Sequence, residues 1–244
     1  MLPFVAAIVA SYLLGSIPSA YLAGKSRGID LRKHGSGNLG ATNVMRVLGT
    51  KIGLLVFAVD MAKGVIPVKF FPRYVPLEVT PLHDPIVMAI ICGVAAIIGH
   101  VRPIYLKFGK GGKGVATAAG MFLALAPVQT LTALVIFAVV LLSSGFVSLG
   151  SILSGVMLPV LLGISVAVRA PESRVSALVR SPVFLISVLV ALFVLWTHRA
   201  NITRLRNGEE HRFGKRGVAG KRTAATLAIT LAIALATFMA ARFS

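Results

Sequence analysis

Residues 115–142 read VATAAGMFLALAPVQTLTALVIFAVVLL, a stretch of 28 positions without a charged side chain. It is longer than the roughly 20 residues that an apolar helix needs to cross a bilayer. Pro127 stands near its middle, and a proline inside a helix ends or kinks it. The stretch therefore predicts either a hairpin of two membrane helices, Val115 to Ala126 and Val128 to Leu142, or one kinked helix.

Similar apolar runs recur on both sides of this stretch. The 244 residues are 57% hydrophobic and 13% charged, with a mean hydropathy of +0.89, whereas a soluble domain has about a quarter charged residues. The sequence therefore predicts an all-α fold, a polytopic transmembrane helix bundle in one membrane-embedded domain. The other expected spans are Leu2 to Ala23, Ile52 to Phe71, Pro85 to Gly99, Ser148 to Val168, Pro182 to Thr197 and Ala224 to Ala241.

Basic residues in the loops favour the hairpin. With a hairpin, loops 24–51, 102–114 and 198–222 share one side and hold 18 of the 25 basic residues, whereas one kinked helix gives a division of 14 to 11. The positive-inside rule then puts these three loops in the cytoplasm and both termini outside. The net charge of +18 fits an anionic membrane surface and phosphorylated substrates. Nucleic acid is not expected as a partner, because the basic residues lie in short loops between apolar spans.

The first basic loop is rich in glycine. Gly35, Gly37 and Gly40 match the spacing of a dinucleotide-binding motif, but they follow a membrane span instead of a strand, which argues against a Rossmann unit. Glycines before a helix still let backbone N–H groups converge on an anion. The candidate binding residues of this loop are Ser36, Gly37, Asn38, Thr42, Asn43 and Arg46.

Two local expectations go with this loop. Arg46 is expected in the first turn of the following helix, close to the bound anion. Thr42 or Asn43 has a structural alternative, because either side chain could cap that helix without touching a ligand.

The second basic loop contains GKGGKG at 109–114, directly before an expected helix. It departs from a Walker A loop, because Lys107 stands where that motif has its first glycine and no Ser or Thr follows Lys113. Backbone N–H groups beside lysine charges nevertheless predict a phosphate-binding loop. His100, before this loop, is either a structural interfacial histidine or a functional one. The candidate binding residues are Lys107, Gly109, Gly111, Gly112, Lys113 and Gly114.

The third basic loop begins with His198 and Asn201, which share a face if this stretch is helical. Arg204 continues that face and is a candidate substrate-binding residue. Histidine can move a proton near neutral pH, and the asparagine could orient it or a substrate hydroxyl. Glu209 and Glu210 stand among arginines, so structural ion pairing is predicted for both.

Several other residues have two readings. Asp60 and Lys63 lie three apart inside an expected span, and mutual pairing is favoured over a functional role. Ser148 begins another span and serves either helix packing or catalysis. Cys92 is expected to be a small buried hydrophobe. No metal-ligand cluster and no GxSxG elbow occur in the sequence, so neither a metal nor a cofactor is expected.

Six stretches together resemble one family, the acyl-phosphate-dependent glycerol-3-phosphate acyltransferases of bacterial membranes. They occur in the family's order and cover the chain from about residue 10 to 215. They are GSIPSAYLAG at 15–24, GSGNLGATNVMR at 35–46, DMAKG at 60–64, GHVRPIYLKFGKGGKGVAT at 99–117, SLGSI at 148–152 and HRANITRLRNGEE at 198–210.

The resemblance implies an enzyme that transfers an acyl group from acyl phosphate to glycerol 3-phosphate, giving 1-acylglycerol 3-phosphate for phospholipid synthesis. It implies about seven spans and three cytoplasmic motifs that meet at one site. By motif match, Ser36 and Arg46 belong to the first motif and the glycines with Lys107 and Lys113 to the second. The remaining residues implied at the site are Ser148, His198 and Asn201.

The chain departs from the family pattern after about residue 222. We therefore expect an acyltransferase domain at 1–222 and an extra transmembrane helix at 223–244. The expected location is the bacterial inner membrane, with the site facing the cytoplasm. Expected partners are the two substrates, membrane lipids and other enzymes of phospholipid synthesis.

Two other functions compete with this interpretation. A transporter of organic phosphates would be expected to have a midplane site and repeat symmetry, and no repeat is evident in the sequence. A lipid-head-group enzyme with a nucleotide-activated donor usually needs an acidic metal cluster, and the seven acidic residues lie mostly apart.

Overall fold

The computed structural model describes residues 1–170 and 173–213. All regular secondary structure in these residues is helical, which confirms the all-α expectation. The chain divides into two compact units, Met1–Leu125 (unit 1) and the part that begins at Ala126 (unit 2). The extra span expected at 223–244 lies outside the described residues.

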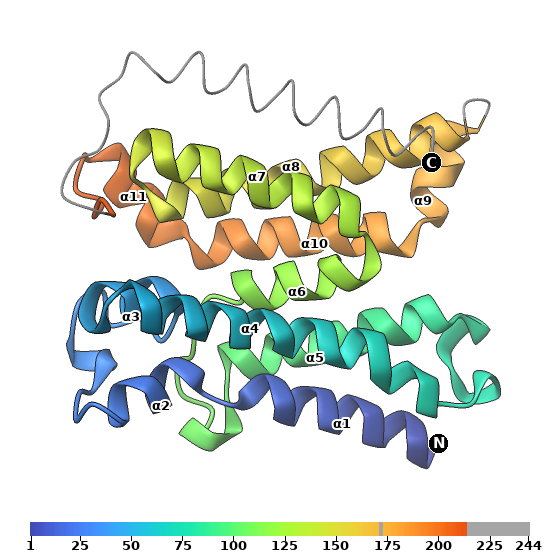
Figure 1. Cartoon of the computed structure of the whole chain (residues 1–244). Coiled ribbons are helices and arrows are strands. Elements are labelled where there is room, and N and C mark those ends of the chain that lie inside the picture. The colour runs from blue at the N-terminus through green and yellow to red at the C-terminus, as the bar shows by residue number, and fades with distance from the viewer. Residues whose placement is uncertain (171–172, 214–244) are drawn as a thin grey trace. The chain divides into compact units, whose positions relative to one another are not determined.

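Unit 1 is built from antiparallel helices with two long loops at one end. Figure 1 shows α1 lying along α5, and α4 lying along α6. Five short 3-10 turns lie in the connections, among them η1 (Leu31–Lys33) and η5 (Ile104–Leu106) in the two loops. The α-helices are α1 (Leu2–Ser16), α2 (Ser19–Lys25), α3 (Ala41–Leu48), α4 (Thr50–Phe70), α5 (Pro85–Val101) and α6 (Val115–Leu125).

Glycines set the close approach of these helices. A Cβ on Gly15 of α1 would collide with the carbonyl of Ala96 on α5. A Cβ on Gly120 of α6 would likewise collide with the carbonyl of Met61 on α4. Small residues allow such backbone contact, on which helix association in a membrane depends.

The first predicted span is interrupted. Helix α1 ends at Ser16 and α2 begins at Ser19, with Pro18 between them. Proline has no N–H to donate and clashes with the preceding turn, so the helix breaks there. The two helices together still form a candidate span, Leu2–Lys25.

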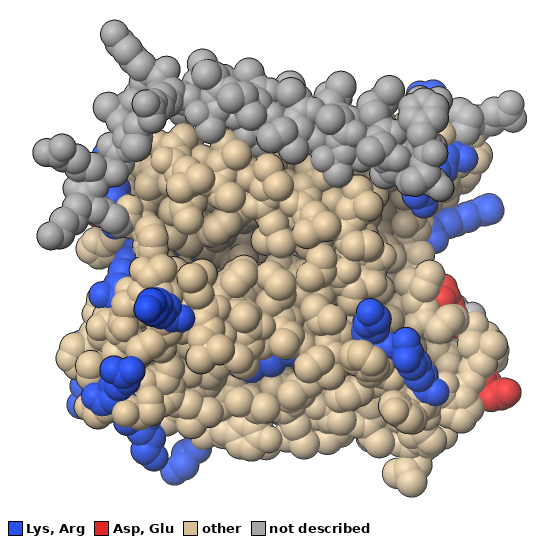
Figure 2. All heavy atoms as spheres, viewed as in Figure 1, with Lys and Arg blue, Asp and Glu red and all other residues tan. Residues whose placement is uncertain are grey.

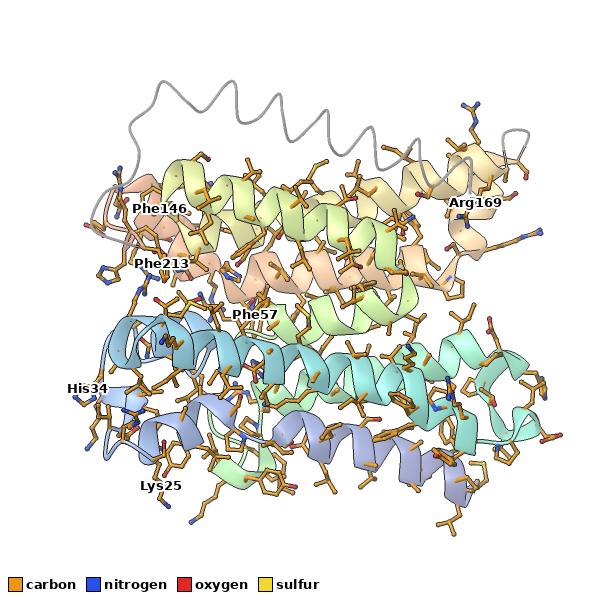
Figure 3. The ribbon with its side chains drawn as sticks, viewed as in Figure 1. Lys25, His34, Phe57, Phe146, Arg169 and Phe213 are labelled. Atoms are coloured by element: carbon orange, nitrogen blue, oxygen red, sulfur yellow. The ribbon has the colours of Figure 1, made fainter. Side chains whose placement is uncertain are left out.

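Unit 2 contains α7 (Pro127–Ser144), α8 (Val147–Arg169), α9 (Arg174–Arg180), α10 (Pro182–Thr197) and α11 (Arg199–Arg206). Helix α8 packs against both α7 and α10. The chain reverses between α7 and α8 at Gly145, whose φ of 77° suits glycine. Figure 3 shows Phe146 and Phe213 at the same end of this unit, where the Phe213 N–H donates to the Gly145 carbonyl at 2.7 Å.

Four described helical stretches are long and apolar enough to cross a membrane, or five if α9 and α10, bent by 72°, form one span. This supports a membrane protein, but it does not confirm the expected number of seven spans. Helix α4 has 21 residues and carries Asp60 and Lys63 in its interior, and α6 has only 11 residues. The four stretches are Leu2–Lys25, Pro85–Leu106, Pro127–Ser144 and Val147–Arg169.

The stretch around Pro127 forms two helices. Helix α6 ends at Leu125, α7 begins at Pro127, and Ala126 has a non-helical backbone with φ −148° and ψ 71°. One continuous helix through Ala126 is therefore excluded. The hairpin alternative requires two separate helices here, and the structure has two. Figure 2 shows that the charged side chains of unit 1 lie mainly at the ends of its helices, and the flank between them is mostly uncharged, as a lipid-facing surface would be.

Candidate functional site

The first glycine loop is closed by Asn43, whose side chain is almost completely buried in α3. Its Oδ1 accepts a hydrogen bond from the Ser36 N–H at 2.8 Å. Its Nδ2 donates to the carbonyls of Leu31 at 3.2 Å and His34 at 3.0 Å. Both amide protons serve the loop itself, so Asn43 shapes the loop, and the binding role predicted for it stays a prediction.

Two further expectations for this loop are wrong. Gly40 occupies the N-cap position of α3, so neither Thr42 nor Asn43 caps the helix. Arg46 lies in the last turn of α3 and not in its first, because the helix begins at Ala41 and has only eight residues. Arg46 is half-buried there, whereas Thr42 lies in the first turn.

Other predicted residues lie on the outer part of this loop. Ser36 is exposed and Gly37, with φ 68°, provides the turn that follows it. The Asn38 side-chain oxygen is buried without a hydrogen-bond partner. At the start of the loop, Arg32 donates hydrogen bonds to the Asp30 carboxylate, and these bonds lower the pKa of Asp30 to about 2.

The second glycine loop has an unusual backbone. Lys107 and Phe108 have φ values of 54° and 58°, in the left-handed region that residues other than glycine rarely adopt. The N–H groups of three glycines bond within the loop and its flanks, Gly109 to Leu106, Gly111 to Val101 and Gly112 to His100. An anion would therefore be bound by N–H groups nearer the start of α6, with Lys107 and Lys113 as charges. Lys107 is exposed, Lys113 is half-buried and Gly114 is buried.

The two glycine loops lie against each other. A Cβ on Gly112 would collide with Nε2 of His100 and would lie 3.0 Å from the carbonyl oxygen of Leu39 in the first loop. A Cβ on Gly111 would collide with the carbonyl oxygen of His100. Glycine at both positions is thus required by close packing, and the structure brings together two of the three predicted motifs within unit 1.

Inside the helices of unit 1, Asp60 and Lys63 form an ion pair with 2.7 Å between Nζ and Oδ1. The predicted pairing is therefore confirmed. Ser19 donates to the Asp60 carboxylate and accepts from Lys63, and Nδ1 of His100 lies 3.6 Å from Oδ1 of Asp60. The sequence pattern did not single out Ser19, because its partners are more than 40 positions away.

Three of the predicted residues of unit 2 donate to one carboxylate, that of Glu210. The Ser148 hydroxyl donates to Oε1 at 2.9 Å, and Nδ2 of Asn201 donates to the same oxygen at 2.7 Å. Nε of Arg204 donates to Oε2 at 2.8 Å. The expected ion pairing of Glu210 is confirmed, but its contact with three site candidates was not predicted.

The charge of Glu210 is well compensated. Burial would raise the pKa of Glu210, but the hydrogen bonds from Asn201, Ser148 and Arg204 outweigh that effect and lower it. The carboxylate is therefore ionised at neutral pH, when it accepts all three hydrogen bonds. Glu209 beside it is exposed, so the two neighbouring glutamates differ completely in environment.

His198 lies at the carboxyl end of α10 and is buried. Its Nδ1 is 2.8 Å from the carbonyl oxygen of Val194. Because a carbonyl only accepts hydrogen bonds, Nδ1 carries the proton in the neutral ring and Nε2 carries the lone pair. His198 thus has the tautomer of a histidine whose Nε2 can take up a proton.

Within residues 1–170 and 173–213, no group of three His, Cys, Asp or Glu side chains could hold a metal ion. Cys92 is buried in α5, where burial was expected.

Comparisons with known proteins identify the family. The sequence profile described as Glycerol-3-phosphate acyltransferase matches residues 5–208. The Glycerol-3-phosphate acyltransferase of Chlorobaculum tepidum is 43% identical over 232 residues, covering 88% of this chain and 100% of the relative. The protein of the same name from Prochlorococcus marinus strain MIT 9312 is 44% identical over 209 residues, covering 85% and 96%.

Two solved structures are also similar. A crystal structure of PlsY (YgiH), an integral membrane glycerol 3-phosphate acyltransferase, in its glycerol 3-phosphate form, has 34% identity and a TM-score of 0.71, covering 86% of this chain and 96% of that chain. Its lysophosphatidic acid form has 32% identity and a TM-score of 0.69, covering 92% and 98%.

Fold, membrane-spanning helices and these matches together define an integral membrane acyltransferase. The chain belongs to the glycerol-3-phosphate acyltransferase family.

Proposed function

We propose that this protein transfers an acyl group from acyl phosphate to the 1-hydroxyl of glycerol 3-phosphate, releasing phosphate and 1-acylglycerol 3-phosphate. The observation that carries the proposal is the contact between two glycine loops in unit 1, at Gly112 and Leu39. Each loop leads into a helix amino terminus with basic residues nearby, which suits a phosphorylated ligand. The names of the relatives and of the PlsY structures support glycerol 3-phosphate as the acceptor.

In unit 1 we assign phosphate binding to three cations, Arg46, Lys107 and Lys113. The backbone contributions come from the starts of α3 and α6, whose first N–H groups have no partner inside the helix. Acyl phosphate already has a good leaving group, so the enzyme needs mainly to position the substrates and stabilise charge. The remaining candidates for phosphate contacts are Ser36, Gly37, Asn38, Thr42 and Gly114. Gly109, Gly111 and Gly112 are assigned to shaping the second loop, because their N–H groups donate within the loop and its flanks.

In unit 2 we assign the general base to His198 and the positioning of its surroundings to Asn201 and Ser148. Histidine exchanges a proton near neutral pH, and with Nδ1 bonded to the Val194 carbonyl the proton of the attacking hydroxyl would be taken up at Nε2. The alternative base is the leaving phosphate itself. Arg204 belongs with Asn201 and Ser148, because all three donate to Glu210.

For the donor, we favour acyl phosphate over acyl-CoA and acyl carrier protein. The loop at 109–114 is compact, whereas an acyl-CoA site must also hold an adenine and a pantetheine arm. A docking surface for acidic acyl carrier protein would need exposed basic residues but no tight glycine loop. We further propose that the basic loops face the cytoplasm at the bacterial inner membrane, following the positive-inside rule.

The decisive experiment supplies each donor separately to the purified protein with glycerol 3-phosphate. We expect lysophosphatidic acid from acyl phosphate and little from acyl-CoA or acyl carrier protein. Robust turnover with acyl-CoA alone would overturn the donor assignment. Movement of unchanged glycerol 3-phosphate across a vesicle membrane, without any new product, would instead identify a transporter.

A second experiment tests the base. His198→Ala should lower kcat by about 10²- to 10⁴-fold if His198 takes the proton. A loss of less than 10-fold at saturating substrates would favour proton transfer to the leaving phosphate. The exposed His83 of unit 1 provides the control variant His83→Ala, which should stay close to wild type.

A further inference from the structure

The buried cluster of unit 1 contains none of the residues assigned to the reaction. It consists of Ser19, Asp60, Lys63 and His100. Asp60 and Lys63 have exposed side-chain fractions of 1% and 3%, and His100 has 7%. Charges inside membrane helices are expensive and commonly functional, so the cluster needs an explanation beyond the pairing of Asp60 with Lys63.

One part of the cluster belongs to the broken first span. Lys63 donates to the carbonyl of Ile17, which the break at Pro18 leaves without a helical partner. It also donates to Ser19 at 2.9 Å, just beyond the break. The ammonium group therefore stabilises the interruption between α1 and α2, but this role does not involve His100.

The His100 ring extends from this cluster to the second glycine loop. Nδ1 faces Asp60 at 3.6 Å, while Nε2 lies where a Cβ on Gly112 would be. The backbone of His100 is involved too, because its carbonyl accepts from the Gly112 N–H at 3.3 Å. A displaced ring would therefore displace Gly112, and Gly112 in turn packs on Leu39 of the first loop.

The far end of the loop rests on the same turn of α4. A Cβ on Gly64, the residue after Lys63, would collide with the carbonyl oxygen of Thr117 in the first turn of α6. The Thr117 hydroxyl is buried without a hydrogen-bond partner. The segment from His100 to Thr117 is thus held at both ends by residues 60–64 of α4.

We propose that His100 is a positioning residue for the second glycine loop, held in place by the buried pair of Asp60 and Lys63. The cluster keeps Gly111 and Gly112 in place, and with them the segment that leads to the phosphate-binding N–H groups at the start of α6. The inference rests on the proposed function, because it takes the loop to be a phosphate-binding element. It assigns to the buried charges a role in substrate affinity, beyond holding the broken helix.

The test compares His100→Ala and His100→Gln with the wild type in inorganic phosphate binding and in the KM for acyl phosphate. Ala removes the ring, whereas Gln keeps a polar group for Asp60 but not the flat ring beside Gly112. We expect the phosphate dissociation constant and this KM to rise together by about 10- to 100-fold in the Ala variant, as misplacement of a binding group does. Gln should give a smaller rise. His83→Gln, at an exposed histidine, should change neither.

Asp60→Asn provides an independent second variant, because it keeps the shape of the side chain and removes the charge that holds His100 and Lys63. It should raise both constants in the same direction. Phosphate binding and KM within twofold of wild type in folded His100→Ala and His100→Gln proteins would overturn the inference, whatever happens to kcat or to the melting temperature. If His100→Ala does not fold, the Gln variant decides.

The same measurements separate this inference from the proposed function. Wild-type protein that binds phosphate but does not turn over acyl phosphate would refute the proposed function, and the binding constants would still test His100. Wild-type protein that does not bind phosphate would overturn both the phosphate-binding loop and the role of His100.

Discussion

Each unit contains a buried carboxylate, Asp60 in unit 1 and Glu210 in unit 2, and the surroundings of the two carboxylates differ. Asp60 lies inside α4 and is neutralised by Lys63, three residues away on the same helix. Glu210 lies after α11 and is bound by Arg204 and Asn201 from α11 and by Ser148 from α8. Each carboxylate has a basic partner three or six positions away and also accepts a hydrogen bond from a distant serine, Ser19 or Ser148. The two differ mainly in how exposed the basic partner is.

This difference determines how much solvent can compensate. Both partners of the Asp60 pair are almost completely buried, so neither charge can turn to water if the other is removed. Arg204 has 36% of its side chain exposed, so water partly replaces a lost partner. A buried ion pair is not in itself a source of stability, but breaking one is strongly destabilising. The Asp60 pair should therefore be the more sensitive of the two.

The largest effect is expected from Lys63→Met, which leaves the Asp60 carboxylate buried without its ammonium partner. The free energy of unfolding should fall by about 3–5 kcal/mol. Thermal unfolding in detergent measures it, with the exposed Lys69→Met on the same helix as the matched control. Adding Asp60→Asn to Lys63→Met should restore part of the loss, because no charge then remains buried. A double variant as unstable as Lys63→Met alone would contradict this account.

Glu210→Ala should have the next largest effect. It removes the acceptor of three hydrogen bonds, but partial exposure of Arg204 limits the penalty, so we expect a loss of about 2–3 kcal/mol, the range for one hydrogen bond to a charged group. The exposed neighbour gives the control, because Glu209→Ala should stay within about 0.5 kcal/mol of wild type. Equal losses for both glutamates would show that Glu210 does not organise unit 2.

Ser148→Ala sharpens the contrast within unit 2, because it removes only one of the donors to Glu210. Its stability loss should be about 1 kcal/mol, typical of a single hydrogen bond. If Ser148 is also catalytic, as the family resemblance implies, kcat should fall by much more than this stability loss explains. Unchanged kcat would reduce Ser148 to a structural role.

The smallest effect on stability is expected from a change in pH. In the group formed by Ser148, Asn201, Arg204 and Glu210, the titrating carboxylate is that of Glu210. The pKa of folded Glu210 lies below its ordinary value of 4.5, so its contribution to stability is present above that pH. It is lost as the pH falls through the folded pKa. Glu210→Gln should remove this part of the acid dependence of the melting temperature. Half-buried Asp30, with a pKa of about 2, titrates in the same direction in both proteins. Identical acid profiles for wild type and Glu210→Gln would contradict the assignment.

Sequence alone predicted much of the fold, because apolar length and helix breakers are local properties. The expected spans Pro85 to Gly99, Val115 to Ala126 and Pro182 to Thr197 agree with α5, α6 and α10 to within two residues at either end. The separate helices on either side of Ala126 follow from Pro127. The apolar run from Leu2 to Ala23 predicts an unbroken first span. The structure breaks this span at Pro18, between α1 and α2.

The candidate site divides in the same way. Spacing on one helix predicted that Asp60 would pair with Lys63, since residues three apart share a face. Glycine spacing indicated the two loops that meet at Gly112 and Leu39. The prediction that Arg46 lies in the first turn of α3 was wrong. The helix begins after Gly40 and not at a polar capping residue, so Arg46 lies in its last turn.

What only the tertiary structure decided is which polar side chains share partners across long sequence separations. The sequence predicted that Glu210 would form an ion pair with an arginine. It did not predict that Ser148 and Asn201 would donate hydrogen bonds to the same carboxylate. It contained Asn43 and His100 without indicating that the first closes a loop and the second lies against Gly112. The physical reason is that hydrogen bonds and close contacts depend on distances set by helix packing, whereas sequence patterns report only neighbours along one helix or loop.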